Sequence, residues 1–137
     1  TSGKVFEMSS REASMSAMTL ERIEAVYAMA KQIYNGSISR VDGNIKVAED
    51  TGMKLSSVSF YTSAFFAMME GKEFKRAINQ TATRYYIENI RKDFGDDYFR
   101  RAIETTRLHL RYMKEVGGAN LPGQERLLDE LESEIKK

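Results

Sequence analysis

Apolar residues recur at intervals of three and four along most of the chain, which is the spacing of one face of an α-helix. The clearest stretch begins at Thr19, which is expected to cap the helix, and closes at Asn35 and Gly36. The inward positions of this first predicted helix are Leu20, Ile23, Val26, Tyr27, Ala30 and Ile33.

Two further helices are predicted in the next part of the chain. A serine at position 39, followed three residues later by an acid, resembles a capping box and predicts a short helix that ends at Gly52. Beyond this corner, Ser56 or Ser57 is expected to cap a third helix that stops at Gly71. The apolar positions of the third helix are Val58, Tyr61, Phe65, Met68 and Met69.

Three more helices are predicted after a polar connector at 72–79. The first opens at Thr81 and is ended by Gly95, and the second begins at Asp96 and closes at Gly117 and Gly118. The last starts at Pro122 and directs Leu127, Leu128, Leu131 and Ile135 inward. No strand pattern is found, so the predicted fold is all-α, a compact bundle of about six helices. Residues 1–18 are expected to form a flexible arm, and 19–137 a single helical domain.

Composition narrows the chemistry. The 137 residues contain no Cys and one His, which excludes disulfides, thiol nucleophiles, cysteine-based zinc sites and multi-histidine metal sites. We expect no cofactor, although paired carboxylates remain compatible with hydrolytic metal chemistry. The net charge of +1 argues against a globally basic nucleic-acid binder but allows a local basic patch. Without an apolar run of about 18 residues or a signal-peptide pattern, the chain is expected to be cytoplasmic, with no membrane partner.

The segment 44–63 follows the size rules of a helix-turn-helix. A small residue, Ala48, stands where two such helices would cross, and Gly52 stands four residues later at the corner. The positions expected to point between the two helices are Val47, Met53, Val58 and Tyr61. Ordinary packing of two helices satisfies the same pattern, so both interpretations remain open.

If this motif reads DNA, the first turns of its second helix face the duplex. The candidate contacts are Lys54, Ser56, Ser57, Ser59, Phe60 and Ser63. Serine hydroxyls can donate to phosphates, and Phe60 can contact a thymine methyl group. No Arg or Asn stands in this first turn, which weakens the case for sequence-specific readout.

The charges are unevenly distributed. Between Lys72 and Lys114 there are 11 Lys or Arg against 6 Asp or Glu, whereas acids exceed bases from Gly118 onward. Such an asymmetry can place a basic face over phosphates while the acidic end stays away. The predicted contacts here are Lys72, Lys75, Arg76, Asn79 and Arg84. The alternative is a set of solvated helix faces with intrahelical ion pairs such as Glu104 with Arg107.

His109 and the aromatic residues have structural and functional interpretations. A lone helical His is more often a hydrogen-bonded structural residue than a catalytic one, and no oriented partner is evident for His109. The aromatic residues could stack a base, but their helical spacing favours a place in the core. These residues are Tyr61, Phe65, Phe66, Tyr85, Tyr86, Tyr98 and Phe99.

Beyond these patterns, the segment 53–121 resembles a helical domain found beside HNH nuclease domains in bacterial proteins of the McrA-like restriction type. The resemblance rests on Gly52, Met53, Ser57, Tyr61, Ala64, Phe65, Met68, Gly71, Lys72, Phe74, Arg76, Ile78, Asn79, Ala82, Thr83, Tyr85, Tyr86, Ile87, Ile90, Phe94, Gly95, Ala102, Leu108, His109, Leu110 and Tyr112. It implies a DNA-targeting module whose partners are double-stranded DNA and a nuclease domain. The chain lacks a second His for an HNH metal site, so the resemblance places the cutting elsewhere.

Two rival functions remain. The chain could be a protein-interaction or oligomerisation module without direct DNA contact, in which the Met-rich third helix or the Leu-rich last helix packs against a partner or forms a homodimer. The weaker rival is an enzyme that uses His109 with nearby carboxylates.

Overall fold

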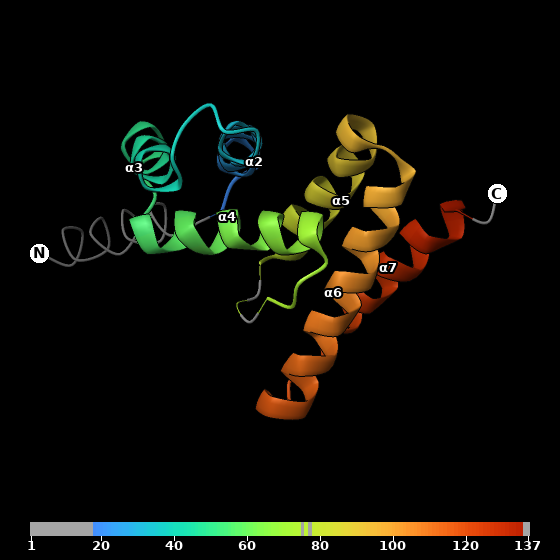
Figure 1. The fold of residues 1–137 in the computed structure, drawn as a ribbon. Helices are drawn as coiled ribbons and strands as arrows, with labels where there is room; N and C mark the ends of the chain where they lie inside the picture. The colour runs from blue at the N-terminus through green and yellow to red at the C-terminus, as the bar shows by residue number, and fades with distance from the viewer. Residues whose placement is uncertain (1–17, 75, 77, 136–137) are drawn as a thin grey trace, which may run out of the picture. The chain divides into compact units, whose positions relative to one another are not determined.

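The computed structural model describes residues 18–74, 76 and 78–135, and within them the fold is all-α, without strands. Six helices follow one another along this part of the chain, as the sequence predicts (Figure 1). They are α2 (Leu20–Tyr34), α3 (Arg40–Thr51), α4 (Leu55–Glu70), α5 (Gln80–Phe94), α6 (Asp96–Gly117) and α7 (Pro122–Ile135).

The helices belong to two compact units, of which the first ends at Ser59 and the second begins at Phe60, within α4. The prediction of a flexible arm over 1–18 lies outside the described residues, apart from Met18. The prediction of one helical domain over 19–137 stays a prediction.

Most helix ends lie where the sequence predicts them. The Thr19 hydroxyl accepts a hydrogen bond from the Arg22 amide at 3.2 Å, and the Ser39 hydroxyl accepts one from the Asp42 amide at 3.1 Å. Each bond satisfies a backbone donor that the first turn of a helix leaves unpaired. Gly52 ends α3 with a φ of 75°, in the left-handed region that glycine adopts without steric cost.

Two predicted helix starts are wrong. Helix α4 begins at Leu55, so neither Ser56 nor Ser57 is its cap, and the Val58 amide already donates to the Lys54 carbonyl at 3.1 Å. Helix α5 begins at Gln80 rather than Thr81, because the Asn79 side chain caps it. At α5, Asn79 competes with Thr81, and propensity alone does not decide which of the two opens the helix.

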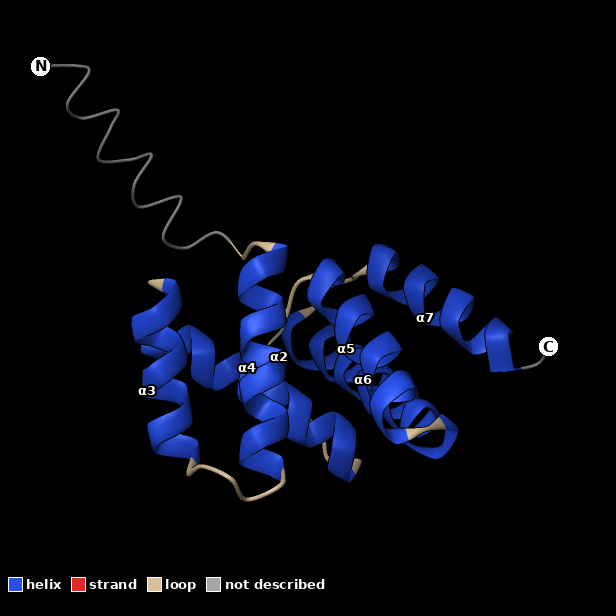
Figure 2. Ribbon diagram, turned by 90° about the horizontal axis from the view of Figure 1, so that it is seen from above, coloured by secondary structure: helices blue, strands red, loops and turns tan. Residues whose placement is uncertain are grey.

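In the first unit, α2 packs against α3, as the two labelled helices side by side in Figure 2 show. Gly43 lies at their closest approach. A Cβ atom at Gly43 would stand 2.8 Å from Cδ1 and 2.9 Å from Cγ1 of Ile33, and 3.1 Å from Sδ of Met29. The glycine inside α3, which weakens the helix signal of the sequence, is therefore required by packing. The buried side chains of this unit include Ile23, Val26, Tyr27, Met29, Ala30, Val47, Met53 and Val58.

In the second unit, α5, α6 and α7 pack against one another, and successive helices run in opposite directions (Figure 1). The later part of α4 adds aromatic contacts, because the Phe65 ring lies 6.2 Å from the Tyr86 ring and 6.3 Å from the Phe94 ring. The core of this unit includes Phe65, Met68, Met69, Tyr86, Ile87, Ile90, Phe99, Ala102, Leu127, Leu128 and Leu131.

We predict that Gly43→Ala destabilises the first unit by about 1 kcal/mol. The helix gains roughly 0.5–1 kcal/mol from the replacement of glycine, but overpacking against Ile33 costs about 1–3 kcal/mol. In an Ile33→Ala background the clash is relieved, and the same substitution should stabilise. Urea unfolding followed by circular dichroism measures both effects in a double-mutant cycle. Equal effects of Gly43→Ala in the two backgrounds would contradict the close approach.

Candidate nucleic-acid interface

The part of the predicted interface that lies in the first unit surrounds the start of α4. Lys54 and Ser56 are exposed, whereas Ser57 and Ser59 are half-buried. Lys54 forms no ion pair with any described residue. Thus only Lys54 and Ser56 of the four predicted residues offer a largely open side chain.

The backbone before these residues is fixed by the corner. The Gly52 amide donates to the Ala48 carbonyl at 3.0 Å, which ends α3. The Thr51 hydroxyl donates to the Val47 carbonyl at 2.6 Å and accepts from the Met53 amide at 3.3 Å. The Met53 side chain is buried, with 6% of its surface exposed. The glycine corner of the predicted helix-turn-helix is therefore present, and its role in reading DNA stays a prediction.

The part that lies in the second unit contains Phe60, Ser63, Lys72 and Arg76. The Arg76 guanidinium carbon lies 4.7 Å from the centre of the Phe60 ring, a cation–π contact that occupies one face of the aromatic side chain predicted to contact thymine. Ser63 is exposed. Lys72 Nζ pairs with Glu70 Oε2 at 3.0 Å, but 75% of the lysine side chain stays exposed. Such an open pair is weak enough for a phosphate to compete with it.

Asn79 is a capping residue. Its side-chain oxygen accepts from the Ala82 amide at 2.7 Å, its carbonyl accepts from the Thr83 hydroxyl at 3.0 Å, and its amide donates to the Tyr61 hydroxyl at 3.4 Å. These bonds explain why polar residues stand at 79 and 83 without invoking DNA. Burial raises the pKa of the Tyr61 hydroxyl. Lys75, another predicted contact, lies outside the described residues.

Arg84 is already engaged by acids. Its guanidinium pairs with Glu130 of α7 at 2.7 Å and with Glu88 at 3.3 Å. The hydrogen bond to Glu130 is the largest of the interactions that raise the pKa of Arg84. A phosphate would have to compete with two carboxylates to reach it, so Arg84 is less available than Lys72 or Arg76.

The pairing of Arg84 belongs to a wider pattern in which α7 supplies acids to arginines of α5 and α6. Arg91 pairs with Glu134 at 3.3 Å, and also with Asp96 at 2.9 Å. Arg107 pairs with Asp129 at 2.9 Å and with Glu132 rather than with Glu104. The acids of α7 therefore lie against the basic segment and pair with three of its arginines. A basic face over phosphates stays a prediction.

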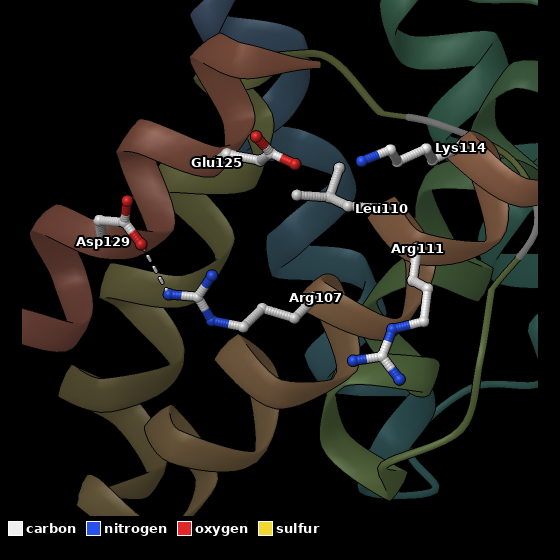
Figure 3. A pocket seen from close by; sticks show the side chains of 6 residues that line it. All are labelled: Arg107, Leu110, Arg111, Lys114, Glu125 and Asp129. Carbon is white, nitrogen blue, oxygen red and sulfur yellow. Dashed lines mark hydrogen bonds and ion pairs between the residues drawn. The ribbon is translucent and has the colours of Figure 1, made fainter. Parts of the chain in front are cut away.

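A cleft of about 370 Å³ lies between α6 and α7 (Figure 3). Its lining residues are Arg107, Leu110, Arg111, Lys114, Glu125 and Asp129. Arg111 and Lys114 are exposed and form no ion pair with a described residue. Sequence reasoning missed this group, although the spacing 107, 111, 114 places three cations on one side of a helix.

His109 is buried, as expected for a structural residue. Its Nδ1 lies 2.6 Å from the Phe74 carbonyl, so Nδ1–H donates there, and its ring stacks on the Phe74 ring at 4.1 Å. Burial lowers the pKa of His109, outweighing the Phe74 hydrogen bond and the nearby Glu73 charge, which both act to raise it. Three of the aromatic residues considered for base stacking, Phe65, Tyr86 and Phe99, are fully buried in the core.

Within the described ranges, no three His, Asp or Glu side chains are gathered as metal ligands would be, and no helix is both long and apolar enough to cross a membrane. Comparison with known proteins adds nothing to the site: no family model matches the chain, and neither a curated protein nor a solved structure matches it. The resemblance to McrA-like helical domains consequently stays a prediction.

We predict that acid selectively destabilises the second unit through His109. The pKa of the folded His109 lies below its ordinary value of 6.5, so the unfolded chain takes up a proton first as the pH falls. The stabilisation is complete above about pH 6.5 and decreases below it, by less than about 1.4 kcal/mol per pH unit. Urea unfolding at pH 7.5, 6.5 and 5.5 measures the slope. His109→Asn, which cannot titrate, should flatten it, and an unchanged slope in this variant would assign the effect to other groups.

Proposed function

We propose that the chain is a DNA-binding helical module that targets a restriction-type nuclease domain to duplex DNA. The observation that carries the proposal is the start of α4, where Lys54 and Ser56 stand exposed directly after the Gly52 corner. Buried Met53 and Val58 on either side restrain this segment. The distributed resemblance to helical domains beside HNH nucleases supports the nuclease partner.

The exposed groups favour contact with phosphates over reading of bases. Lys54 supplies a charge, and the Ser56 hydroxyl and the free backbone donors of the first turn of α4 supply hydrogen bonds. Within the second unit, Lys72 and Arg76 supply two further exposed cations. Arg76 is the arginine of this set, and its guanidinium, which suits bidentate contact with guanine, lies over the Phe60 ring. We therefore expect strong salt dependence and modest sequence preference.

A specific observation also favours the rival function of a protein-interaction module. Val41 and Ile45 stand one turn apart on α3 and are 68% and 39% exposed. On the two helices that the sequence suggested for such contacts, Met68, Met69, Leu128 and Leu131 have no exposed surface, whereas Leu55 and Phe60 of α4 are 49% and 36% exposed. Val41 and Ile45 give an interaction module an exposed apolar surface on α3. Sedimentation of Val41→Glu beside the unaltered chain distinguishes the two functions, since only an interaction module would lose association.

We predict that Lys54→Ala weakens binding to a labelled duplex of about 20 base pairs by severalfold for all sequences. Loss of one phosphate contact should also lower the slope of log affinity against log salt by about 1. Fluorescence anisotropy titrations between 50 and 200 mM salt measure both quantities.

Lys92→Ala is the matched control, because Lys92 is an exposed lysine near the end of α5 and its removal changes the net charge equally. Equal weakening by Lys54→Ala and Lys92→Ala would show a diffuse charge effect. Absence of duplex binding by the unaltered chain at 50 mM salt would overturn the proposed function.

A further inference from the structure

The cleft between α6 and α7 has walls of opposite charge (Figure 3). Helix α6 contributes Arg107, Arg111 and Lys114, and α7 contributes Glu125 and Asp129. Leu110, with 7% of its surface exposed, lies between the walls. All of these residues belong to the second unit, so the geometry of the cleft does not depend on the first.

The cations of the α6 wall are not equivalent. Arg107 reaches across to α7, where Asp129 and Glu132 hold its guanidinium. Arg111 and Lys114, the next two cations along the helix, have no such carboxylate among the described residues. Helix geometry places positions 107, 111 and 114 within an arc of about 60°. The cleft therefore has Arg107 held by two acids at one end, and beside it two cations, Arg111 and Lys114, that form no ion pair with a described residue.

Two such charges about one turn apart suit an anion that carries several oxygen atoms. Phosphate meets this requirement, because Lys binds it as a point charge and Arg binds it through a planar fork of donors. Figure 3 shows the Lys114 amine directed toward Glu125 on the α7 wall, whereas the Arg111 guanidinium points away from Lys114. To bind the same phosphate as Lys114, the exposed Arg111 side chain has to turn toward the cleft.

The α7 wall selects among phosphates. Glu125 is exposed, lies in the first turn of α7 and forms no ion pair with the rest of the described chain. Its carboxylate repels a bare phosphate dianion but accepts hydrogen bonds from hydroxyl groups. A volume of about 370 Å³ falls at the small end of the range of ligand sites. A phosphate ester of a small polyol satisfies the charge, the acceptor and the size together.

We propose that the α6–α7 cleft binds a pentose phosphate, with Arg111 and Lys114 on the phosphate group and Glu125 on the sugar hydroxyls. Leu110 contributes an apolar surface to the cleft, and the Arg107 pairs fix the spacing of its walls. The ligand can be a free sugar phosphate or the terminal nucleotide of a nucleic-acid strand, which share this chemistry. The inference is independent of the DNA contacts proposed for α4.

Isothermal titration of the full chain with ribose 5-phosphate at low ionic strength tests the cleft. We expect binding that weakens at least tenfold in Arg111→Ala and in Lys114→Ala. Arg100→Ala is the matched control, because Arg100 is an exposed cation earlier on α6 that lines a separate cleft of about 200 Å³. Because all three arginine and lysine side chains are exposed or partly exposed, circular dichroism should show unchanged folding. No binding at millimolar concentration, or equal losses in all three variants, would overturn the proposal.

Glu125→Gln tests the selectivity separately. Inorganic phosphate should bind the unaltered chain more weakly than ribose 5-phosphate does, and Glu125→Gln should strengthen its binding severalfold and reduce the preference for the ester. A preference that is absent in the unaltered chain or unaffected by the substitution would refute the role of Glu125 and with it the assignment to a pentose phosphate.

Competition with DNA identifies the source of the ligand. A duplex with 5′-phosphorylated ends that displaces ribose 5-phosphate from Lys54→Ala supports the cleft as a site for strand ends. If the duplex does not displace ribose 5-phosphate, which still binds on its own, the natural ligand is a free sugar phosphate. Because Lys54 belongs to the α4 site and Arg111 and Lys114 to the cleft, loss of function in one set of variants leaves the other proposal standing.

Discussion

The connector between α4 and α5 is the constraint on which the second unit depends. Two of its residues, Phe74 and Ile78, are buried, and a buried carbonyl group requires a donor. His109 of α6 donates to the Phe74 carbonyl, and Nε2 of Gln124 in α7 donates to the Ile78 carbonyl at 3.1 Å. At the end of the connector, the Tyr61 hydroxyl of α4 accepts from the Asn79 amide. Side chains from three helices thus converge on one short segment, and the register of each helix is fixed relative to it.

The charged residues of α7 have a different part in stability. Leu127, Leu128 and Leu131 are buried and supply the apolar surface that holds the helix in place. The ion pairs to Arg84, Arg91 and Arg107 are partly exposed, and pairs of this kind contribute little each. They also engage three arginines of the segment 72–114, in which basic residues outnumber acidic ones. The cations left for a bound anion are consequently those that form no ion pair with the acids of α7.

The sequence was sufficient to predict the helices and most of their ends, because apolar periodicity and capping residues are local signals. It also predicted the Gly52 corner and a hydrogen-bonded, structural role for His109. It did not predict that Asn79 caps α5 or that the absence of a side chain at Gly43 leaves room for Ile33 of the neighbouring helix. Both features depend on which residues lie within a few ångströms in the folded chain. The pairing of Arg84 with Glu130 joins residues 46 positions apart and was beyond any local pattern. The α6–α7 cleft was likewise beyond any local pattern, because only the packing of α7 against α6 brings Glu125 opposite Lys114.

The stack of Phe74 on His109 also provides a spectroscopic handle. Circulating π-electrons of the phenyl ring shield nuclei held above its face, so the imidazole carbon-bound protons should resonate upfield of their positions in an unstructured peptide. His109 is the single histidine of the chain, and its signals are therefore assignable without isotope-labelled mutants. Their chemical shift reports directly whether Phe74 of the connector stays stacked on His109 while a ligand, a salt or a denaturant is added.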